Sequence, residues 1–313
     1  MLPSSGSAEL PSADAVPSSN SAGSLNAALP PKFNIYLELS KPGVGGLVIV
    51  TTLCGALTAP GRVAFGRLLI TLMGTALVVA GANAANMWLE RDTDVFMRRT
   101  RTRPLPSGRL APEAALWFSG LTCVAGLALL VSCVGWLTAA LAALAYVSYV
   151  AAYTPLKRVT PLALFVGAVP GAIPPLIGWA SARGELSTLG WLEFLVLFVW
   201  QLPHFLAIAI FRRDEYARAG LLVLPVVHGV RRTKIEILLY SAALVAVSLL
   251  PVGLGLTGLG YAAVAIACGL PFLVLASAGL SVADDRRWAR RVFFASMPYL
   301  VLTLGALSIF STR

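Results

Sequence analysis

Nine long apolar segments occupy most of this 313-residue chain, and their length constrains the fold more than any other feature. A helix needs about 20 apolar residues to cross the hydrocarbon core of a bilayer. The segments lie at approximately 43–60, 64–86, 114–133, 135–153, 161–181, 190–211, 235–254, 257–279 and 292–310. Only 12% of the residues are charged, against about 25% in a soluble domain. We therefore predict an all-α membrane protein with nine transmembrane helices.

Lys and Arg residues gather in alternate loops. Twenty of the 24 lie before the first segment or in the loops that follow the second, fourth, sixth and eighth segments. Positive residues favour the cytoplasmic side of a membrane. We expect an integral protein of the cytoplasmic (inner) membrane, with its N-terminus in the cytoplasm and its C-terminus outside. Because these charges sit in short loops between apolar runs, the net charge of +10 does not indicate nucleic-acid binding.

The first 31 residues differ in composition from the rest of the chain. They are rich in Ser, Ala and Pro and contain no Lys or Arg. Such a stretch cannot bury enough apolar surface to fold, and it lacks the basic and apolar regions of a signal peptide. We predict a disordered N-terminal tail over residues 1–31 and one transmembrane domain over residues 32–313.

A row of oxygen-bearing side chains stands at the end of the second apolar segment. Asn86, Glu90 and Asp94 are spaced four residues apart, so on a helix they share one face. Mg²⁺ is usually held by one or two carboxylates plus substrate phosphates, and guanidinium groups bind phosphate oxygens. Four arginines follow the row: Arg98, Arg99, Arg101 and Arg103. The stretch favours a magnesium–diphosphate site; the alternative is a solvated helix end whose arginines only anchor the cytoplasmic side.

The fifth segment is rich in proline and is preceded by two cations. Five prolines lie between residues 155 and 175. Proline removes a backbone donor and kinks a helix, and irregular backbone at membrane depth is tolerated where it lines a cavity or is buried in protein. Lys157 and Arg158 stand at its cytoplasmic mouth, and the ring of Tyr153 could stabilise a cation. A pocket wall and a kinked packing helix are both compatible with this pattern.

The sixth segment contains His204, one of two histidines in the chain. An ionisable residue inside a membrane helix indicates function, because burial without a partner is costly; the alternative is a hydrogen bond between helices. Asp214 follows this segment among several arginines. If the second and sixth segments lie together, two clusters of acids and bases face one cavity.

Three motifs, taken together, resemble one enzyme family. They are "NMWLERDTDVFMRRTRTRPLPSG", "YTPLKRVTP…GAIPPLIGW" and "WQLPHFLAIAIFRRDEYARAGLLVLP". In this order and topology they resemble the protohaem IX farnesyltransferases, or haem O synthases, of the UbiA-type intramembrane prenyltransferase superfamily. "SKPG" at 40–43 is similar to the Lys-Pro pair before the first helix of that family. The resemblance covers about residues 33–310; Glu90 replaces the usual Asp and keeps the charge.

The resemblance implies a fold and a reaction. The fold is a bundle of nine helices around a central cavity open to the cytoplasmic side. In the reaction, farnesyl diphosphate loses diphosphate to give an allylic cation, the 2-vinyl group of haem B attacks this cation, and water captures the result. The product is haem O. Mg²⁺ is the implied cofactor, and farnesyl diphosphate, haem B and the lipid bilayer are the implied partners. Haem A synthase or terminal oxidase assembly is the expected recipient of the product.

The resemblance also suggests roles for individual residues. We predict that Asn86, Glu90 and Asp94 hold Mg²⁺ and that Asp214 completes this metal site. A second set is expected to bind the substrates: Lys41, Arg98, Arg103, Tyr153, Lys157, Arg158 and His204, the last as a contact of the haem. Two other functions are kept as alternatives. One is a prenyltransferase acting on a quinone precursor or another tetrapyrrole, and the other is a transporter.

Overall fold

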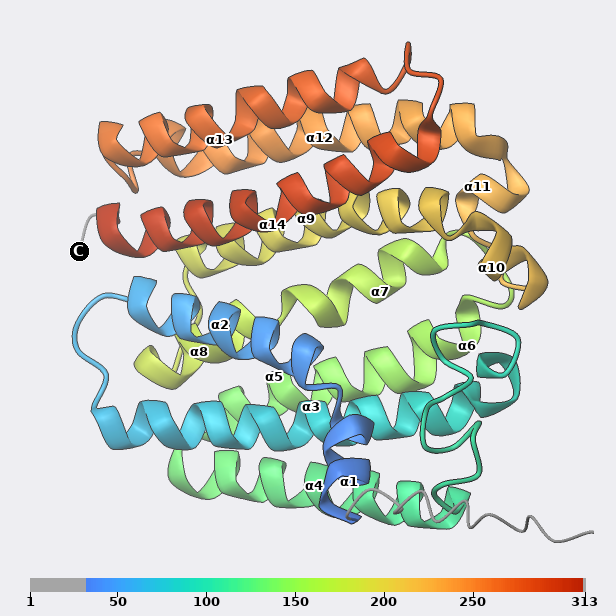
Figure 1. Ribbon diagram of the computed structural model, residues 1–313. Coiled ribbons are helices and arrows are strands. Elements are labelled where there is room, and N and C mark those ends of the chain that lie inside the picture. Colours follow the sequence, from blue (N-terminus) through green and yellow to red (C-terminus); the bar gives the residue numbers. More distant parts are fainter. Residues whose placement is uncertain (1–31, 312–313) are drawn as a thin grey trace, which may run out of the picture.

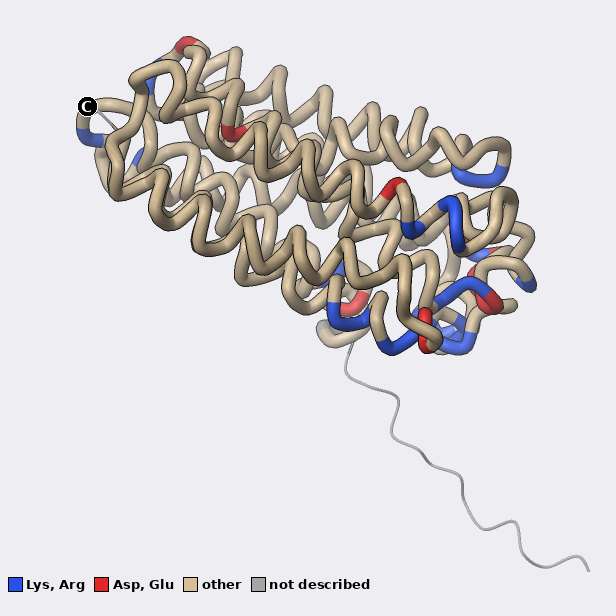
Figure 2. The backbone as a smooth tube through the Cα atoms, turned by 90° about the horizontal axis from the view of Figure 1, so that it is seen from above, with Lys and Arg blue, Asp and Glu red and all other residues tan. Residues whose placement is uncertain are grey.

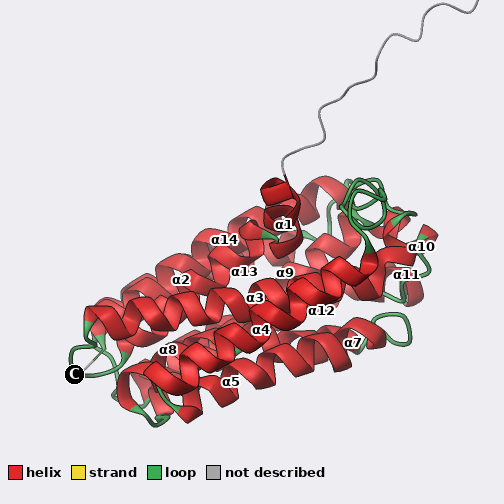
Figure 3. Ribbon diagram, turned by 90° about the horizontal axis from the view of Figure 1, so that it is seen from below, coloured by secondary structure: helices red, strands yellow, loops and turns green. Residues whose placement is uncertain are grey.

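The computed structural model describes residues 32–311, and this part of the chain is almost entirely helical (Figures 1 and 3). The predicted disordered tail at residues 1–31 lies outside the described residues. Beside the helices, the described part contains one isolated β-bridge, between Thr257 and Ser311. The prediction of an all-α protein is confirmed.

The helices follow one another along the chain with short connections. Their bounds are α1 Lys32–Ser40, α2 Pro42–Thr58, α3 Phe65–Asp94, α4 Pro112–Cys133, α5 Trp136–Val147, the π-helical turn η1 Ser148–Tyr153, α6 Thr154–Leu156, α7 Ala163–Ala172, α8 Pro174–Arg183, α9 Thr188–Phe211, α10 Arg213–Arg218, α11 Leu224–Val227, α12 Gly229–Gly253, α13 Leu259–Ala278 and α14 Asp285–Phe310.

Within residues 32–311, eight stretches of helix are long and apolar enough to cross a membrane, and a ninth is possible if α1 and α2 count as one span bent by 54°. These stretches coincide with the nine predicted segments. Three helices extend further into polar sequence than predicted: α3 continues to Asp94, α12 begins at Gly229 and α14 begins at Asp285. Hydropathy marks only the part of a helix that lies in hydrocarbon, so it misses turns that continue beyond it.

The fifth span is broken where the sequence places its prolines. α7 ends at Ala172 and α8 begins at Pro174. A proline at the first position of a helix is favourable because its missing N–H has no partner there in any case. The side-chain amide of Gln201 on α9 donates to the carbonyl oxygen of Ala168 at 3.0 Å. This bond ties α7 to α9 close to the break.

Small residues allow α2 and α8 to pack closely. A Cβ atom on Gly178 would lie 1.9 Å from the carbonyl oxygen of Thr52, and one on Gly55 would lie 2.0 Å from that of Pro175. Close approach of this kind is typical of membrane helices, whose association depends on packing and not on exclusion of water. α9 runs through the middle of the bundle against α7, α12 and α14 (Figure 1).

Charged residues gather at one end of the bundle (Figure 2). We call this the charged end: it comprises α1, the α3–α4 and α6–α7 loops, the region from α10 to the start of α12, and the α13–α14 loop. The opposite end, where the described chain finishes at Ser311, carries few charges. The loops expected on one side of the membrane therefore do lie together.

Candidate active site

Asn86, Glu90 and Asp94 lie on the last turns of α3, at the charged end. Their exposed fractions are 1%, 8% and 0%. The spacing of four residues places them on one face of the helix, and that face points into protein. We call these three residues the α3 row. The alternative of a solvated helix end does not hold for it, because all three side chains are buried.

Each member of the α3 row is contacted by a cation from a different segment. The Lys41 ammonium donates to Asn86 Oδ1 at 2.6 Å, Lys157 forms an ion pair with Glu90, and Arg103 Nη1 lies 2.6 Å from Asp94 Oδ2. Three of the residues predicted to bind the substrates therefore converge on three of the four residues predicted to bind metal. Arg158 lies next to them, donating to the Leu89 carbonyl oxygen at 2.9 Å.

One oxygen of the row has no partner. Asp94 Oδ1 is buried and makes no hydrogen bond, whereas Oδ2 is held by Arg103. A buried acceptor without a partner costs about 1–3 kcal/mol. Within residues 32–311, no group of three or more His, Cys, Asp or Glu side chains could hold a metal ion by itself. An amide and two carboxylates, one with a free oxygen, instead fit a Mg²⁺ site completed by substrate oxygens.

Lys41 stands at the break between α1 and α2. It is the one described non-glycine residue with a positive φ, 51°, a conformation that costs an ordinary residue about 1–2 kcal/mol. The break turns the chain so that the side chain reaches Asn86. An anionic ligand placed here would stabilise the charged ammonium of Lys41.

Lys157 follows the π-helical turn η1, a feature often found at functional sites. Its ammonium lies 4.9 Å from the centre of the Tyr153 ring, a cation–π distance. Burial opposes the charge, but Tyr153 and the Glu90 carboxylate outweigh it and raise the pKa of Lys157 above its usual range. Lys157 is therefore a fixed positive charge facing the α3 row.

Two residues that the sequence reasoning missed shape this site. Asn86 Nδ2 donates to Thr154 Oγ1 at 3.1 Å, and Thr154 in turn donates to the Tyr149 carbonyl oxygen of η1 at 2.8 Å. The Tyr153 ring lies over Gly167 of α7, where a Cβ atom would come within 2.4 Å of it. A threonine and a glycine in apolar sequence carry no signal of such roles. The one sequence signal for a role of Thr154 is its position next to Tyr153, which was itself predicted to bind substrate.

The structure does not join two of the predicted residues to the α3 row. Arg98 and Asp214 are exposed, and within the described part of the chain neither forms a hydrogen bond or ion pair with the row. The loops that carry them do pack together, through Met97, Ala219 and Leu221. α10 is only six residues long, and Asp214 lies on its solvated side. A role for Arg98 or Asp214 in ligand binding stays a prediction.

His204 is buried between α9 and α14. Its Nδ1 lies 2.7 Å from Ser296 Oγ, and its ring stacks on Trp200 with centroids 4.6 Å apart and lies 4.7 Å from Phe293. The hydrogen bond between helices that the sequence left open as an alternative is therefore present. A contact between His204 and haem stays a prediction.

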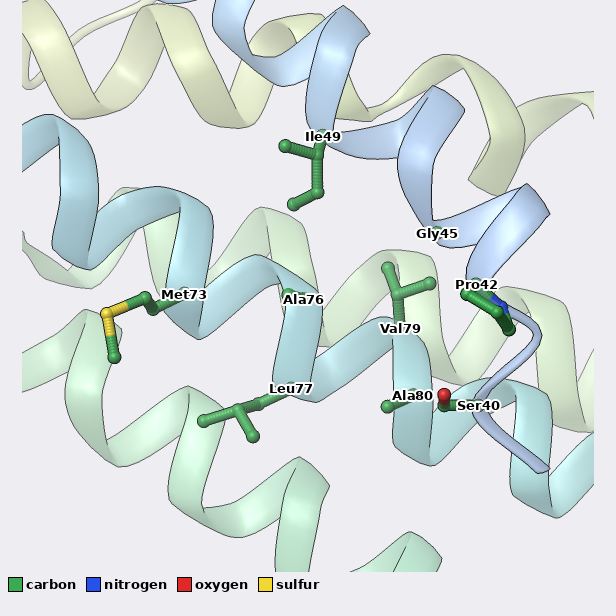
Figure 4. A pocket seen from close by; sticks show the side chains of 9 residues that line it. All are labelled: Ser40, Pro42, Gly45, Ile49, Met73, Ala76, Leu77, Val79 and Ala80. Carbon is green, nitrogen blue, oxygen red and sulfur yellow. The ribbon is translucent and has the colours of Figure 1, made fainter. Parts of the chain in front are cut away.

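A groove of about 450 Å³ runs between α2 and α3 (Figure 4). Its walls are apolar and include Gly45, Ile49 and Ala76. One end is formed by Ser40 and Pro42, the residues on either side of Lys41. Because Lys41 contacts Asn86, this end of the groove lies beside the α3 row. The distance along α3 from residue 73 to residue 86 is about 20 Å at 1.5 Å per residue.

Comparison with known sequences identifies relatives over most of the chain. Residues 47–297 match the UbiA prenyltransferase family. A protein named "Protoheme IX farnesyltransferase" from Sorangium cellulosum (strain So ce56) is 54% identical over 78% of this chain and 87% of its own length. A protein with the same name from Anaeromyxobacter sp. (strain Fw109-5) is 51% identical over 87% of this chain and 91% of its own length. Another from Myxococcus xanthus (strain DK1622) is 43% identical over 90% of this chain and 96% of its own length.

Solved structures share the fold at lower identity. A structure of digeranylgeranylglyceryl phosphate synthase superposes with a TM-score of 0.75 at 18% identity, covering 89% of this chain and 98% of that one. A UbiA homologue from Archaeoglobus fulgidus bound to GPP and Mg²⁺ superposes with a TM-score of 0.64 at 15% identity, covering 88% and 99%. Sequence and fold agree: this chain belongs to the UbiA prenyltransferase family, in its branch of protohaem IX farnesyltransferases.

Proposed function

We propose that this protein transfers the farnesyl group of farnesyl diphosphate to the 2-vinyl group of haem B, with addition of water, to give haem O and diphosphate. The identity of 43–54% to proteins named "Protoheme IX farnesyltransferase" over most of the chain carries this proposal. The α3 row and its three cations provide a site with the chemistry that the reaction needs.

The α3 row is proposed to hold Mg²⁺ together with diphosphate oxygens. Asn86 Oδ1, the Glu90 carboxylate and the partnerless Asp94 Oδ1 are the protein oxygens available. When bound, Mg²⁺ would neutralise charge on the leaving diphosphate. The Archaeoglobus homologue contains Mg²⁺ together with a prenyl diphosphate, which is the same combination. Asp214 remains a candidate fourth ligand, and binding would require α10 to turn towards the row.

The cations of the site are proposed to grip the diphosphate. Lys41, Arg103 and Lys157 contact the three residues of the α3 row. With metal on the carboxylates, the same cations would be free to turn to phosphate oxygens. Arg158, which donates to the Leu89 carbonyl oxygen next to Glu90, and Arg98 are proposed as further contacts of the diphosphate. Negative charge develops on the leaving oxygen as the C–O bond breaks, so preorganised cations stabilise the transition state more than the ground state.

The remaining steps need an apolar environment and no protein nucleophile. The electron pair of the breaking bond leaves with diphosphate, the vinyl π-electrons form the new C–C bond, and a water oxygen adds to the resulting cation and loses a proton. Tyr153, packed over Gly167, is the ring proposed to face the allylic cation. The farnesyl chain is proposed to lie in the α2–α3 groove, whose apolar walls keep bulk water from the reacting carbon.

The protein is proposed to lie in the cytoplasmic membrane with its charged end in the cytoplasm. The grouping of Lys and Arg at that end supports this orientation (Figure 2). The diphosphate site lies at the same end, where a water-soluble leaving group can be released. A central cavity open to this side, and transfer of the product to haem A synthase or terminal oxidase assembly, belong to the same proposal.

A membrane assay tests the function. Membranes containing this protein, and membranes containing the Asp94→Ala variant as a matched control, are incubated with haem B, farnesyl diphosphate and Mg²⁺. We expect a tetrapyrrole that has gained one farnesyl group plus water in the first preparation alone. Prenylation of an added quinone precursor with unchanged haem, or passage of substrate across the membrane without chemical change, would contradict the proposal.

A further inference from the structure

A second groove, of about 740 Å³, lies at the charged end. α7, α9, α11 and α12 form it, and α9 lies between α7 and α12 (Figure 1). Sites for small molecules and cofactors usually have about 300–1,000 Å³. The lining residues that matter here are Phe165, Leu206, Leu224, His228, Arg232 and Tyr240. None of them takes part in the diphosphate site described above.

The groove is amphipathic. Phe165 and Tyr240 meet edge to face across it, with centroids 5.9 Å apart. Its one acid, Glu236, is already engaged: Arg232 Nε donates to it at 2.9 Å and the Tyr240 hydroxyl at 3.3 Å. His228 is exposed and carries no partner among the described side chains. Glu236 engages only Nε of Arg232, so the Nη groups of this guanidinium remain as donors for a carboxylate at the mouth of the groove, while its floor is apolar.

The groove lies close to the diphosphate site. Lys157, which pairs with Glu90, and Thr160, which lines the groove, belong to the same short α6–α7 loop. Three residues of extended chain span at most about 10 Å. A ligand in the groove can therefore bring one edge to this loop while its other edge remains at the mouth.

The two histidines of the chain differ in what they offer a metal-containing ligand. His204 is held by Ser296 and enclosed by aromatic rings. His228 lines the open groove. A neutral imidazole with a free nitrogen is a common axial ligand of haem iron. The ring of His228 is open to such a ligand, whereas the ring of His204 is buried against Trp200 and Phe293.

We propose that the groove between α7, α9, α11 and α12 is the docking site of the tetrapyrrole substrate, with His228 as an axial ligand of its iron and Arg232 as the partner of its carboxylates. The naming of the ligand as haem B rests on the proposed function. The apolar floor at Leu206 and Leu224 accepts the macrocycle, and the vinyl edge faces the α6–α7 loop. This proposal assigns the contact with the haem to His228, whereas the sequence analysis predicted it for His204.

Spectroscopic titration of the purified full-length protein in lipid nanodiscs tests the site. The probes are ferric protohaem IX and iron-free protoporphyrin IX, which share the macrocycle and both carboxylates. His228→Ala should weaken binding of the iron-containing probe at least about tenfold and abolish the spectrum of imidazole ligation, while binding of the iron-free probe is unchanged. Arg232→Gln should weaken binding of both probes. Arg286→Ala, at an exposed arginine on α14, is the matched control and should change neither.

Several results would overturn the docking site. One is an unchanged affinity and spectrum in both His228→Ala and Arg232→Gln; another is loss of ligation in His204→Gln with His228→Ala unaffected. A phospholipid that copurifies with the protein and is lost in Arg232→Gln, with haem binding unchanged, would show a lipid groove instead. The proposed function is tested separately. If wild-type protein binds haem through His228 but forms no haem O, the docking site is supported and the proposed reaction is contradicted.

Discussion

Arg103 Nη1 lies 2.6 Å from Asp94 Oδ2, while Oδ1 of the same carboxylate is buried without a partner. Oδ2 of Asp94 is thus paired with Arg103, and Oδ1 remains available to a ligand. The pair is almost fully buried, with side-chain exposures of 14% and 0%. The contribution of a buried ion pair to stability is small or negative, so we interpret this pair as one that positions the carboxylate for a ligand.

Removing one partner of this pair should damage both stability and activity. Arg103→Met leaves Asp94 as an uncompensated buried charge, and breaking a buried pair in this way costs about 3–5 kcal/mol. The double variant Arg103→Met/Asp94→Asn should regain most of the thermal stability in detergent, because the charge is gone, but no activity. A double variant that regains activity as well would contradict the role of Asp94 in metal binding.

Glu90 and Lys157 give a prediction on substrate affinity. Lys157→Met should raise the KM for farnesyl diphosphate about tenfold or more, since a hydrogen bond to a charged group contributes about 1.5–3 kcal/mol. Glu90→Asp keeps the charge and should retain measurable Mg²⁺-dependent activity, whereas Glu90→Gln should not. Steady-state kinetics at varied Mg²⁺ concentration separates these variants. Equal activity of Glu90→Asp and Glu90→Gln would remove Glu90 from the metal site.

The contact between Gly167 and Tyr153 predicts a defect from adding one methyl group. A Cβ atom at residue 167 would lie 2.4 Å from the Tyr153 ring, so Gly167→Ala must displace the ring that packs against Lys157. We expect a loss of kcat of about tenfold or more, since small misplacements near the reacting atoms are costly. Gly120→Ala on α4 is the control, because nothing lies within 4 Å of a Cβ there. Normal turnover in Gly167→Ala would show that the position of Tyr153 is unimportant.

The α2–α3 groove predicts selection by chain length. Ala76→Leu should narrow the groove at a distance from the α3 row, raise the KM for farnesyl diphosphate several-fold, and affect the shorter geranyl diphosphate less. The physical reason is that the added leucine side chain would clash with the end of the longer farnesyl chain. Competition between the two diphosphates in one assay measures the ratio of their kcat/KM values directly. An unchanged ratio would place the prenyl chain elsewhere.

Much of this architecture could be predicted from the sequence, because a bilayer leaves few choices. Hydropathy located all nine apolar helical stretches, and the spacing of four residues placed Asn86, Glu90 and Asp94 on one face of α3. These features depend on local periodicity and on the thickness of hydrocarbon. The resemblance to a known family suggested substrate-binding roles for Lys41, Arg103 and Lys157. The structure places these three side chains against the α3 row, and their roles stay a prediction.

Other features depend on tertiary contacts that local sequence does not encode. Thr154 matters because η1 presents it to Asn86, and Gly167 because Tyr153 crosses it. His204 was predicted to contact haem because it is an ionisable residue in an apolar span; its hydrogen bond to Ser296, 92 residues further along the chain, depends on the packing of α9 against α14. Asp214 was predicted to bind metal because it is an acid in a basic cluster; its exposure on a six-residue helix depends on how α10 packs, and its role stays a prediction.

Product formation by purified protein tests the central claim most directly. Wild-type protein and Asp94→Ala, matched for folding by their thermal transitions in nanodiscs, receive haem B and farnesyl diphosphate with Mg²⁺ or with a chelator. Mass spectrometry should show haem that has gained farnesyl plus water only with wild-type protein and Mg²⁺. The same product from folded Asp94→Ala, or from wild-type protein in the chelator, would contradict a divalent-metal site on the α3 row.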